Sequence, residues 1–284
     1  MNNNPVLFLD SGIGGFLYCR DFMEKNQHEE TCYLADREHF PYGQRAKEDL
    51  TSILITLTEK ILKLINPKII VLACNTATVS AIHSLRQTFA QIPFVGTVPA
   101  IKPAAARSIK RKIGVLGTSR TIEDLKLQRN FQRLQNNLYQ TDDSKEINIF
   151  GVAAPELVEF VENHFDNAGE SEKNAIVKKY INIFLDEGVD CLVLGCTHFL
   201  YLLNEFKSEA APSITIFDSL DGITRRIEYL LDESNGGDLR AGENFIPSHR
   251  LILTGTQPPE PSWQERLSRE NSPNFKLSLL QHAR

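Results

Sequence analysis

The chain has 284 residues, of which 42% are hydrophobic and 24% are charged, a composition typical of a globular protein with an apolar core. Its formal net charge of −5 argues against nucleic-acid and anionic-membrane partners, since both select a basic surface. No stretch approaches the roughly 18 consecutive apolar residues of a membrane span, and no signal peptide opens the chain. We therefore expect a cytoplasmic protein of two domains, with its five cysteines reduced.

The first predicted strand, Val6 to Leu9, runs into a glycine-rich turn at 10–15, and the segment from Phe16 to Lys25 has helical spacing. The turn lacks the third glycine of a dinucleotide-binding fingerprint, and Asp10 would repel a pyrophosphate, which disfavours nucleotide binding. Asp10 has two other interpretations, a helix N-cap and a catalytic partner, and it could be both.

A second strand, Thr31 to Ala35, leads into a loop from Asp36 to Gly43 that contains turn-forming residues. Loops at strand ends often carry function, although an ordinary exposed turn fits the pattern equally well. The periodic segment from Arg45 to Leu64 is predicted to be a helix that ends before Pro67.

Two later strands each end at a cysteine that is followed at once by hydroxyl or amide residues. The first runs from Ile69 into Cys74-Asn75-Thr76, and the second runs from Cys191 into Cys196-Thr197-His198. Both are unbroken apolar runs, typical of strands buried on both faces of a parallel sheet, and a helix-like segment follows each. Ligands bind at the carboxyl ends of such strands, where a helix N-terminus favours a thiolate. The pattern predicts that Cys74 and Cys196 are a matched pair.

Other roles for cysteine must be weighed against this one. A free cysteine commonly behaves as a small buried hydrophobe, and this is our interpretation of Cys19, Cys32 and Cys191, which no polar turn follows. A structural metal site needs further ligands at close spacing, and the sequence has no C-x-x-C motif or histidine cluster. We therefore predict no metal.

The second half of the chain begins like the first. Residues 112–121 repeat the order of strand, glycine, hydroxyl residues and helix, which suggests two similar α/β domains facing each other. We place the first domain at residues 1–98 plus 209–284 and the second at 99–208, with predicted strands at 213–219 and 250–254 returning to the first sheet. The tail from Ser262 onward has too weak a pattern to assign.

Four motifs, in this order and at these separations, resemble those of glutamate racemases in the cofactor-independent aspartate/glutamate racemase superfamily. They are Asp10-Ser11-Gly12-Ile13-Gly14-Gly15, Pro41-Tyr42-Gly43, Cys74-Asn75-Thr76-Ala77-Thr78 and Gly195-Cys196-Thr197-His198. The match spans roughly residues 6–255, and its two cysteine motifs together are highly specific. The resemblance implies two doubly wound parallel-sheet α/β domains, the first discontinuous, with an active-site cleft between them and often a homodimer.

The resemblance also implies roles for single residues. Cys74 and Cys196 would be the acid/base pair, with Asp10 supporting the first cysteine, and His198 and Glu162 supporting the second. The substrate-binding positions it implies are Asp10, Ser11, Tyr42, Gly43, Asn75, Thr76, Thr118, Thr121, Thr197 and His198. One departure is Ala154, where many relatives carry a cysteine, but that position is not catalytic in the family.

The expected reaction is a cofactor-independent interconversion of L- and D-glutamate, which would supply D-glutamate for peptidoglycan synthesis and cell shape. Inverting an α-carbon requires a base on one face and an acid on the other, and two cysteines supply both. An ionised Asp10 beside a thiol would raise the pKa of that thiol, so Asp10 is expected to take up or orient its proton. We expect glutamate to be preferred over aspartate, because the Tyr42-Gly43 loop offers donors to a longer side chain.

Four alternatives remain open. Within the superfamily, the chain could be an aspartate racemase or a maleate-type isomerase. Outside it, the two cysteines could form a reversible disulfide in a thiol-redox protein, or the site could bind a ligand without catalysis. The polar residues after both cysteines favour racemisation, since a redox pair needs no cradle for a carboxylate.

Overall fold

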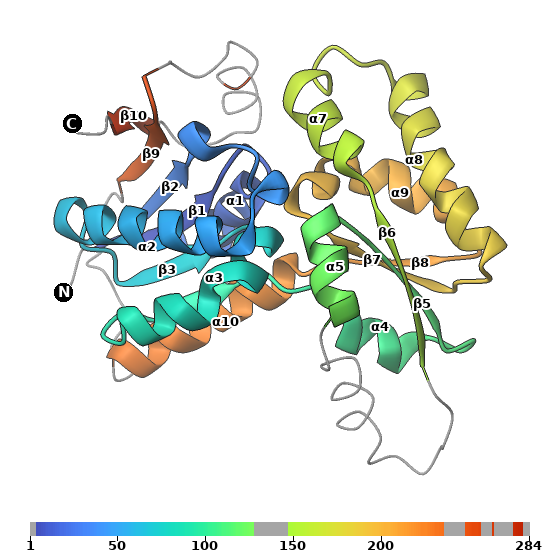
Figure 1. The fold of residues 1–284 in the computed structure, drawn as a ribbon, viewed down its shortest axis with the longest axis horizontal. Coiled ribbons are helices and arrows are strands. Elements are labelled where there is room, and N and C mark those ends of the chain that lie inside the picture. Colours follow the sequence, from blue (N-terminus) through green and yellow to red (C-terminus); the bar gives the residue numbers. More distant parts are fainter. Residues whose placement is uncertain (1–3, 128–146, 236–247, 257–262, 264–274, 281–284) are drawn as a thin grey trace. The chain divides into compact units, whose positions relative to one another are not determined.

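The computed structural model describes residues 4–127, 147–235, 248–256, 263 and 275–280. The chain divides into two compact units, Met1–Thr97 with Leu220–Arg284, and Val98–Ser219. Each unit is built around its own parallel sheet (Figure 1). The predicted pair of parallel-sheet α/β domains is therefore confirmed.

The sheet of the first unit has strand order β10-β9-β2-β1-β3-β4. Its strands are β1 (Val6–Asp10), β2 (Thr31–Ala35), β3 (Ile69–Leu72), β4 (Phe94–Gly96), β9 (His249–Thr254) and β10 (Phe275–Leu280). All residues of β1, β2 and β3 are buried, which explains their unbroken apolar sequences. The register pairs Asp10 with Ala35 and Leu9 with Leu72, so these strands end at the same edge of the sheet.

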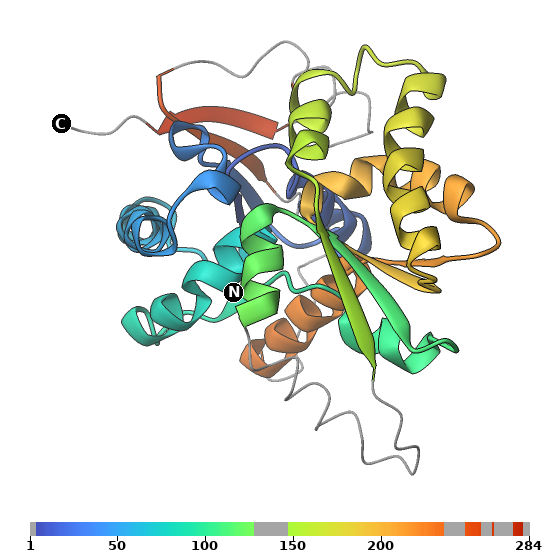
Figure 2. The same cartoon turned by 45° about the vertical axis from the view of Figure 1, so that its right-hand side comes forward.

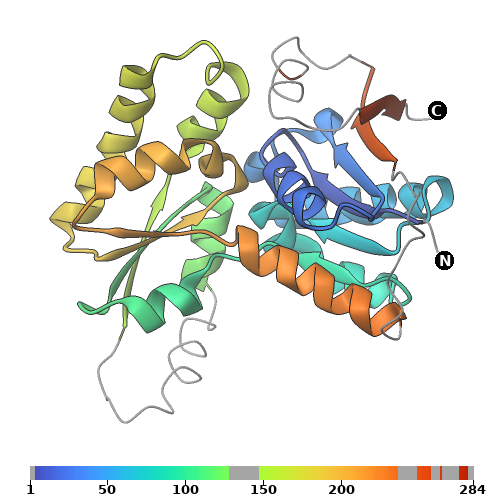
Figure 3. The ribbon, with the colours of Figure 1, turned by 180° about the vertical axis from the view of Figure 1, so that it is seen from behind.

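Helices cover both faces of this sheet. They are α1 (Phe16–Lys25), α2 (Lys47–Leu64), α3 (Asn75–Thr88) and α10 (Leu220–Asn235), with two short 3-10 helices, η1 (Arg37–His39) and η2 (Tyr42–Gln44). Leu7 and Leu9 pack with α2 and α3 on one face, whereas Phe8 contacts Phe22 of α1 on the other. Helices α1 and α10 lie side by side on that second face (Figure 3).

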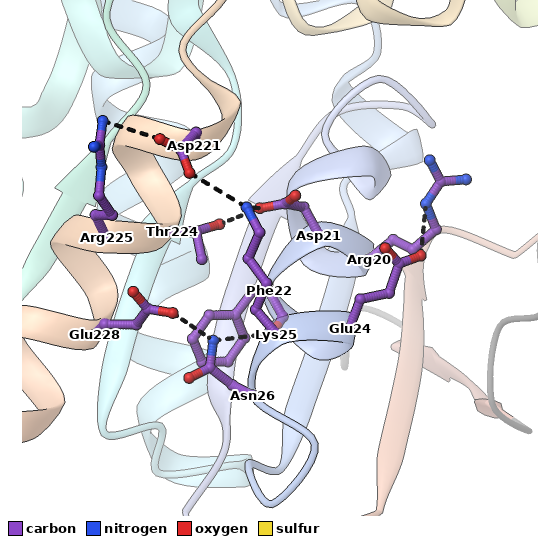
Figure 4. Close-up of polar contacts among 10 residues, drawn as sticks. All are labelled: Arg20, Asp21, Phe22, Glu24, Lys25, Asn26, Asp221, Thr224, Arg225 and Glu228. Atoms are coloured by element: carbon purple, nitrogen blue, oxygen red, sulfur yellow. Dashed lines mark hydrogen bonds and ion pairs between the residues drawn. The ribbon is translucent and has the colours of Figure 1, made fainter.

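Polar contacts join α10 to α1, although their sequences are far apart (Figure 4). Lys25 Nζ lies 2.9 Å from Asp21 and 3.4 Å from Asp221. The Thr224 hydroxyl donates to Asp21 at 2.6 Å. These contacts attach the C-terminal part of the chain to the first unit.

The second unit has a four-stranded sheet in the order β6-β5-β7-β8. Its strands are β5 (Lys112–Gly117), β6 (Asn148–Ala153), β7 (Cys191–Gly195) and β8 (Thr215–Phe217). Its helices are α4 (Ile101–Arg107), α5 (Ser119–Leu127), α7 (Pro155–Asn163), α8 (Glu170–Asp186), η3 (Thr197–Leu202) and α9 (Leu203–Ala210). Figure 2 shows β5 and β6 running side by side, and their residues pair in parallel register.

The two strands expected to return to the first sheet behave differently. The prediction for 250–254 is confirmed, because β9 pairs with β2. The prediction for 213–219 is wrong, because β8 pairs with β7 in the second sheet. Strand β8 follows β7 through η3 and α9, and such a crossover commonly returns to the neighbouring position of the same sheet. The second unit accordingly extends to Ser219 rather than to residue 208.

The unassigned tail contributes β10, which pairs in parallel with β9. Within the described part of the chain, no helix combines the length and the apolar character needed to traverse a bilayer.

Candidate active site

Asp10, the last residue of β1, holds the glycine-rich turn that follows it. Its carboxylate is buried and accepts hydrogen bonds from the N–H groups of Ser11 and Gly15, both at 2.7 Å. A Cβ atom on Gly15 would lie 2.5 Å from the Ala73 carbonyl oxygen, so only glycine allows this close approach. The N-cap position of α1 is Gly15 and has no side-chain cap, so Asp10 stabilises the turn before the helix instead.

Cys74 occupies the N-cap position of α3, with an extended backbone, and its side chain is buried beside the core of the first unit. Asn75 and Thr76 form the first turn of that helix, and both are buried. Asn75 Nδ2 has no hydrogen-bond partner within the described residues. A buried amide donor without a partner is costly, and such a donor is what an acceptor group of a substrate would satisfy.

The loop after β2 is organised by Asp36, whose side chain is completely buried. Its carboxylate accepts hydrogen bonds from the hydroxyls of Tyr42 at 2.8 Å and Thr254 at 2.5 Å. His39 Nδ1 lies 2.8 Å from the same carboxylate. The segment expected to be a loop is therefore two short 3-10 helices, η1 and η2, fixed by one buried acid.

Tyr42 connects this loop to the strand ends of the first unit. Burial raises the pKa of Tyr42 well above its ordinary value, and the charges of Asp36, Cys74 and Asp10 raise it further. The phenol therefore stays protonated and lies near enough to Cys74 and Asp10 to respond to their charges. Asp36 is not among the site residues predicted from the sequence, although it directly follows β2 and Asp10 is the last residue of β1.

In the second unit, Cys196, His198 and Glu162 form a buried chain of contacts. Cys196 occupies the N-cap position of η3, and its Sγ lies 3.8 Å from His198 Nδ1. His198 Nε2 in turn lies 2.7 Å from Glu162 Oε1 on α7. The structure thus brings together the three residues expected to act on the second face of the substrate.

The charges of Cys196 and Glu162 favour a protonated His198 imidazole. Burial lowers the pKa of His198, but the hydrogen bonds and negative charges of Cys196 and Glu162 outweigh it and raise that pKa to about 10. An imidazolium can donate from both ring nitrogens, one toward the carboxylate and one toward the sulfur. A neighbouring imidazolium also stabilises a thiolate, which is the form that can remove a proton.

The three remaining cysteines have a different environment. Burial raises the pKa of the Cys19 thiol, raises that of Cys32 to about 12 and raises that of Cys191 to about 11, where the charge of Asp190 adds to the effect. They are therefore protonated at neutral pH, in agreement with a structural role.

Three threonines expected to bind substrate lie at neighbouring strand ends of the second unit. The Thr118 hydroxyl donates to the Thr121 hydroxyl at 3.0 Å, in the first turn of α5. Gly117 pairs with Gly195, so Thr118 and Cys196 follow paired residues, and Thr197 is buried next to Cys196. Over the part of the chain that the structure describes, no group of three or more His, Cys, Asp or Glu side chains is arranged to hold a metal ion.

Comparison with known proteins decides the family. A family model for Asp/Glu/hydantoin racemases matches residues 21–226, more than half of the chain. The chain belongs to the Asp/Glu/hydantoin racemase family. It is therefore an isomerase, a racemase. Both cysteine motifs lie within the matched residues, whereas Asp10 precedes them and Thr254 follows them.

Relatives of this racemase include the glutamate racemase of Clostridium perfringens, 32% identical over 83% of this chain and 86% of that protein. The glutamate racemase of Herpetosiphon aurantiacus is 34% identical over 81% of this chain and 86% of its own length. Among solved structures, a glutamate racemase isoform of Bacillus anthracis has a TM-score of 0.78 at 26% identity, covering 99% of this chain and 98% of that one. The Escherichia coli glutamate racemase, in complex with L-glutamate and the activator UDP-MurNAc-ala, has a TM-score of 0.78 at 25% identity, with 98% of each chain covered.

Proposed function

We propose that this racemase interconverts L- and D-glutamate without a cofactor, using Cys74 and Cys196 as its acid and base. The observation that carries the proposal is the buried contact chain from Cys196 through His198 to Glu162. Cys196 follows β7 in the second sheet as Cys74 follows β3 in the first, and each occupies the N-cap position of the next helix. The glutamate racemases among its relatives support the choice of substrate.

In this mechanism one thiolate removes the α-proton from one face of the substrate and becomes a thiol. The opposite thiol returns a proton to the other face and becomes a thiolate, so each turnover exchanges the protonation states of Cys74 and Cys196. His198 would stabilise the thiolate form of Cys196 when that cysteine is the base, with Glu162 stabilising the imidazolium. Asp10 would orient the thiol proton of Cys74.

The charge that develops on the substrate carboxylate needs donors that are already in place. Backbone N–H groups at the starts of α3 and η3 are suited to an anion. The buried amide of Asn75 is a further donor, and the hydroxyls of Thr76 and Thr197 add two more. Ser11, Thr118 and Thr121 complete the proposed set of substrate contacts.

The side-chain carboxylate of glutamate would be bound by the loop that contains η2. The Tyr42 hydroxyl already donates its proton to Asp36, so the N–H of Gly43 is the better donor for the substrate. A substrate one methylene shorter would leave this donor unpaired, at a cost of about 1–3 kcal/mol. Glutamate should therefore exceed aspartate in kcat/KM by about tenfold or more.

The product would be D-glutamate for peptidoglycan synthesis and hence for cell shape. The enzyme would act in the cytoplasm as a homodimer, without nucleic-acid or membrane partners. The family resemblance supports the homodimer, and the net charge of −5 supports the absence of nucleic-acid and membrane partners.

The deciding experiment is exchange of the α-proton of glutamate in D₂O with purified, cofactor-free protein. Deuterium should enter both enantiomers while optical rotation decays, and neither a chelator nor a carbonyl reagent should stop the reaction. Inhibition by either reagent would contradict the cofactor-independent mechanism. A Cys74–Cys196 disulfide formed reversibly by mild oxidation, without any exchange at the α-carbon, would instead support the thiol-redox alternative.

A further inference from the structure

Trp263 is the only tryptophan of the chain and lies beyond both the family match and the segment used for substrate binding. Its side chain is 2% exposed. The Arg37 guanidinium lies 4.9 Å from the centroid of the Trp263 ring and 5.0 Å from that of Phe40. Both distances are within the roughly 6 Å at which an aromatic face attracts a cation. Arg37, in the loop after β2, therefore lies against two aromatic rings, and the Trp263 ring comes from the C-terminal tail.

A second contact ties the same loop to the C-terminal part of the chain. Thr254, the last residue of β9, donates its hydroxyl to Asp36 at 2.5 Å. Its oxygen also accepts the N–H of Glu38 at 3.1 Å. The residues on either side of Arg37 are therefore bonded to β9, independently of Trp263.

These two contacts reach the proposed substrate donor, the N–H of Gly43, through Asp36 and Tyr42. Asp36, held by Thr254, accepts the hydroxyl proton of Tyr42 at 2.8 Å. Tyr42 begins η2, and Gly43 is its second residue. Movement of Asp36 or Arg37 would therefore displace the Gly43 N–H.

We infer that Trp263 and Thr254 are positioning residues that set the place of Gly43 and hence the preference for glutamate over aspartate. The inference rests on the proposed function. Neither residue needs to touch the substrate, because Trp263 acts through Arg37 and Thr254 acts through Asp36. A displaced donor weakens binding of the side-chain carboxylate and leaves proton transfer at the α-carbon intact.

The test compares variants that remove each contact. Trp263→Leu removes the aromatic face, Arg37→Met removes the cation at similar length, and Thr254→Val removes the hydroxyl at similar volume. We expect the KM for glutamate to rise by about three- to tenfold in each, with kcat within about twofold of the wild type. The glutamate-to-aspartate ratio of kcat/KM should fall by a similar factor.

Conservative variants and a matched control separate positioning from general damage. Trp263→Phe and Arg37→Lys keep a ring and a cation, so they should recover most of the wild-type KM. Arg226, on the exposed surface of α10, lies 5.0 Å from the Tyr229 ring in a pair of the same kind. Arg226→Met should behave as the wild type.

The outcomes are distinguishable. A wild-type protein that does not racemise glutamate overturns the proposed function, and this inference with it. An active wild type whose Trp263→Leu and Arg37→Met variants keep its KM and substrate ratio overturns the inference alone. A loss of kcat at unchanged KM also contradicts it. If Trp263→Leu fails to fold, Arg37→Met and Thr254→Val decide, since both nearly conserve side-chain volume.

Discussion

His198 Nε2 lies 2.7 Å from Glu162 Oε1, in a pair whose side chains are only 5% and 2% exposed. A carboxylate that is buried next to an imidazole favours the charged form of the ring. Because the other nitrogen of the ring lies 3.8 Å from the Cys196 sulfur, the imidazolium that Glu162 favours is placed next to that sulfur. The protonation state of His198 can therefore be measured to test whether Glu162 and Cys196 keep its ring charged.

His198 should keep its proton well above neutral pH and lose it near pH 10, because Cys196 and Glu162 raise its pKa. His249 should behave in the opposite way, since burial lowers its pKa and the charge of Glu30 only partly offsets that effect. Imidazole nitrogen NMR spectra recorded between pH 5 and pH 10 would follow both rings. A His198 ring that is neutral at pH 8 would contradict the assignment.

The same shift has a consequence for stability. The folded-state pKa of about 10 exceeds the ordinary value of 6.5, so the folded protein binds the proton more tightly than the unfolded chain. The stabilisation is fully present below about pH 6.5 and is lost as the pH rises toward about 10. The free energy of unfolding should therefore fall over this window, and His198→Asn should reduce the slope.

Glu162→Gln should lower kcat by about tenfold or more and leave KM within about threefold, because it acts through His198 rather than on bound substrate. The neutral amide can still accept a hydrogen bond but supplies no charge, so the pKa of His198 should fall in parallel. Steady-state kinetics and the NMR titration would test both effects. Glu159→Gln, on the exposed face of the same helix, is the control and should change neither.

Alanine at Cys74 or Cys196 should reduce kcat by about a hundredfold or more, since each variant lacks one of the two acid/base groups. Alanine at Cys19, Cys32 or Cys191 should leave turnover nearly intact, because burial keeps these thiols protonated. Turnover of the five purified variants in both directions gives the comparison. Near-native activity in either of the first two, or total loss in a folded Cys191→Ala, would refute the assignment.

Asp10→Asn should lower both turnover and stability. An amide can accept from only one of the two backbone N–H groups that the carboxylate now serves, which leaves the other unsatisfied at a cost of about 1–3 kcal/mol. Urea unfolding would measure this loss, with the exposed Asp232→Asn as the control. A variant with wild-type stability would mean that the turn does not depend on Asp10.

Much of the fold was predictable from the sequence because buried parallel strands are apolar without interruption. That signal predicts the β1 and β3 strands, and the polar residues at or beyond their ends indicate Asp10 and Cys74. The three-residue β8 was assigned to the wrong sheet, since a short strand carries no information about its neighbour.

The candidate site was only partly predictable from local pattern. Glu162 lies on an ordinary amphipathic helix and was selected by resemblance alone. Asp36 contacts Thr254, and Arg37 contacts Trp263, at long sequence separations that no local pattern records. Their roles follow from the fold rather than from spacing.

The order of the strands in the first sheet has a consequence for protein synthesis. Strands β9 and β10 leave the ribosome after every other strand that the structure describes, and the whole of Val98–Ser219 is translated before them. The second unit can therefore finish folding while β2 of the nascent chain still has an unpaired edge. Until β9 arrives, that edge is open to pairing with other chains, so slow translation or truncation after Ser219 should promote aggregation.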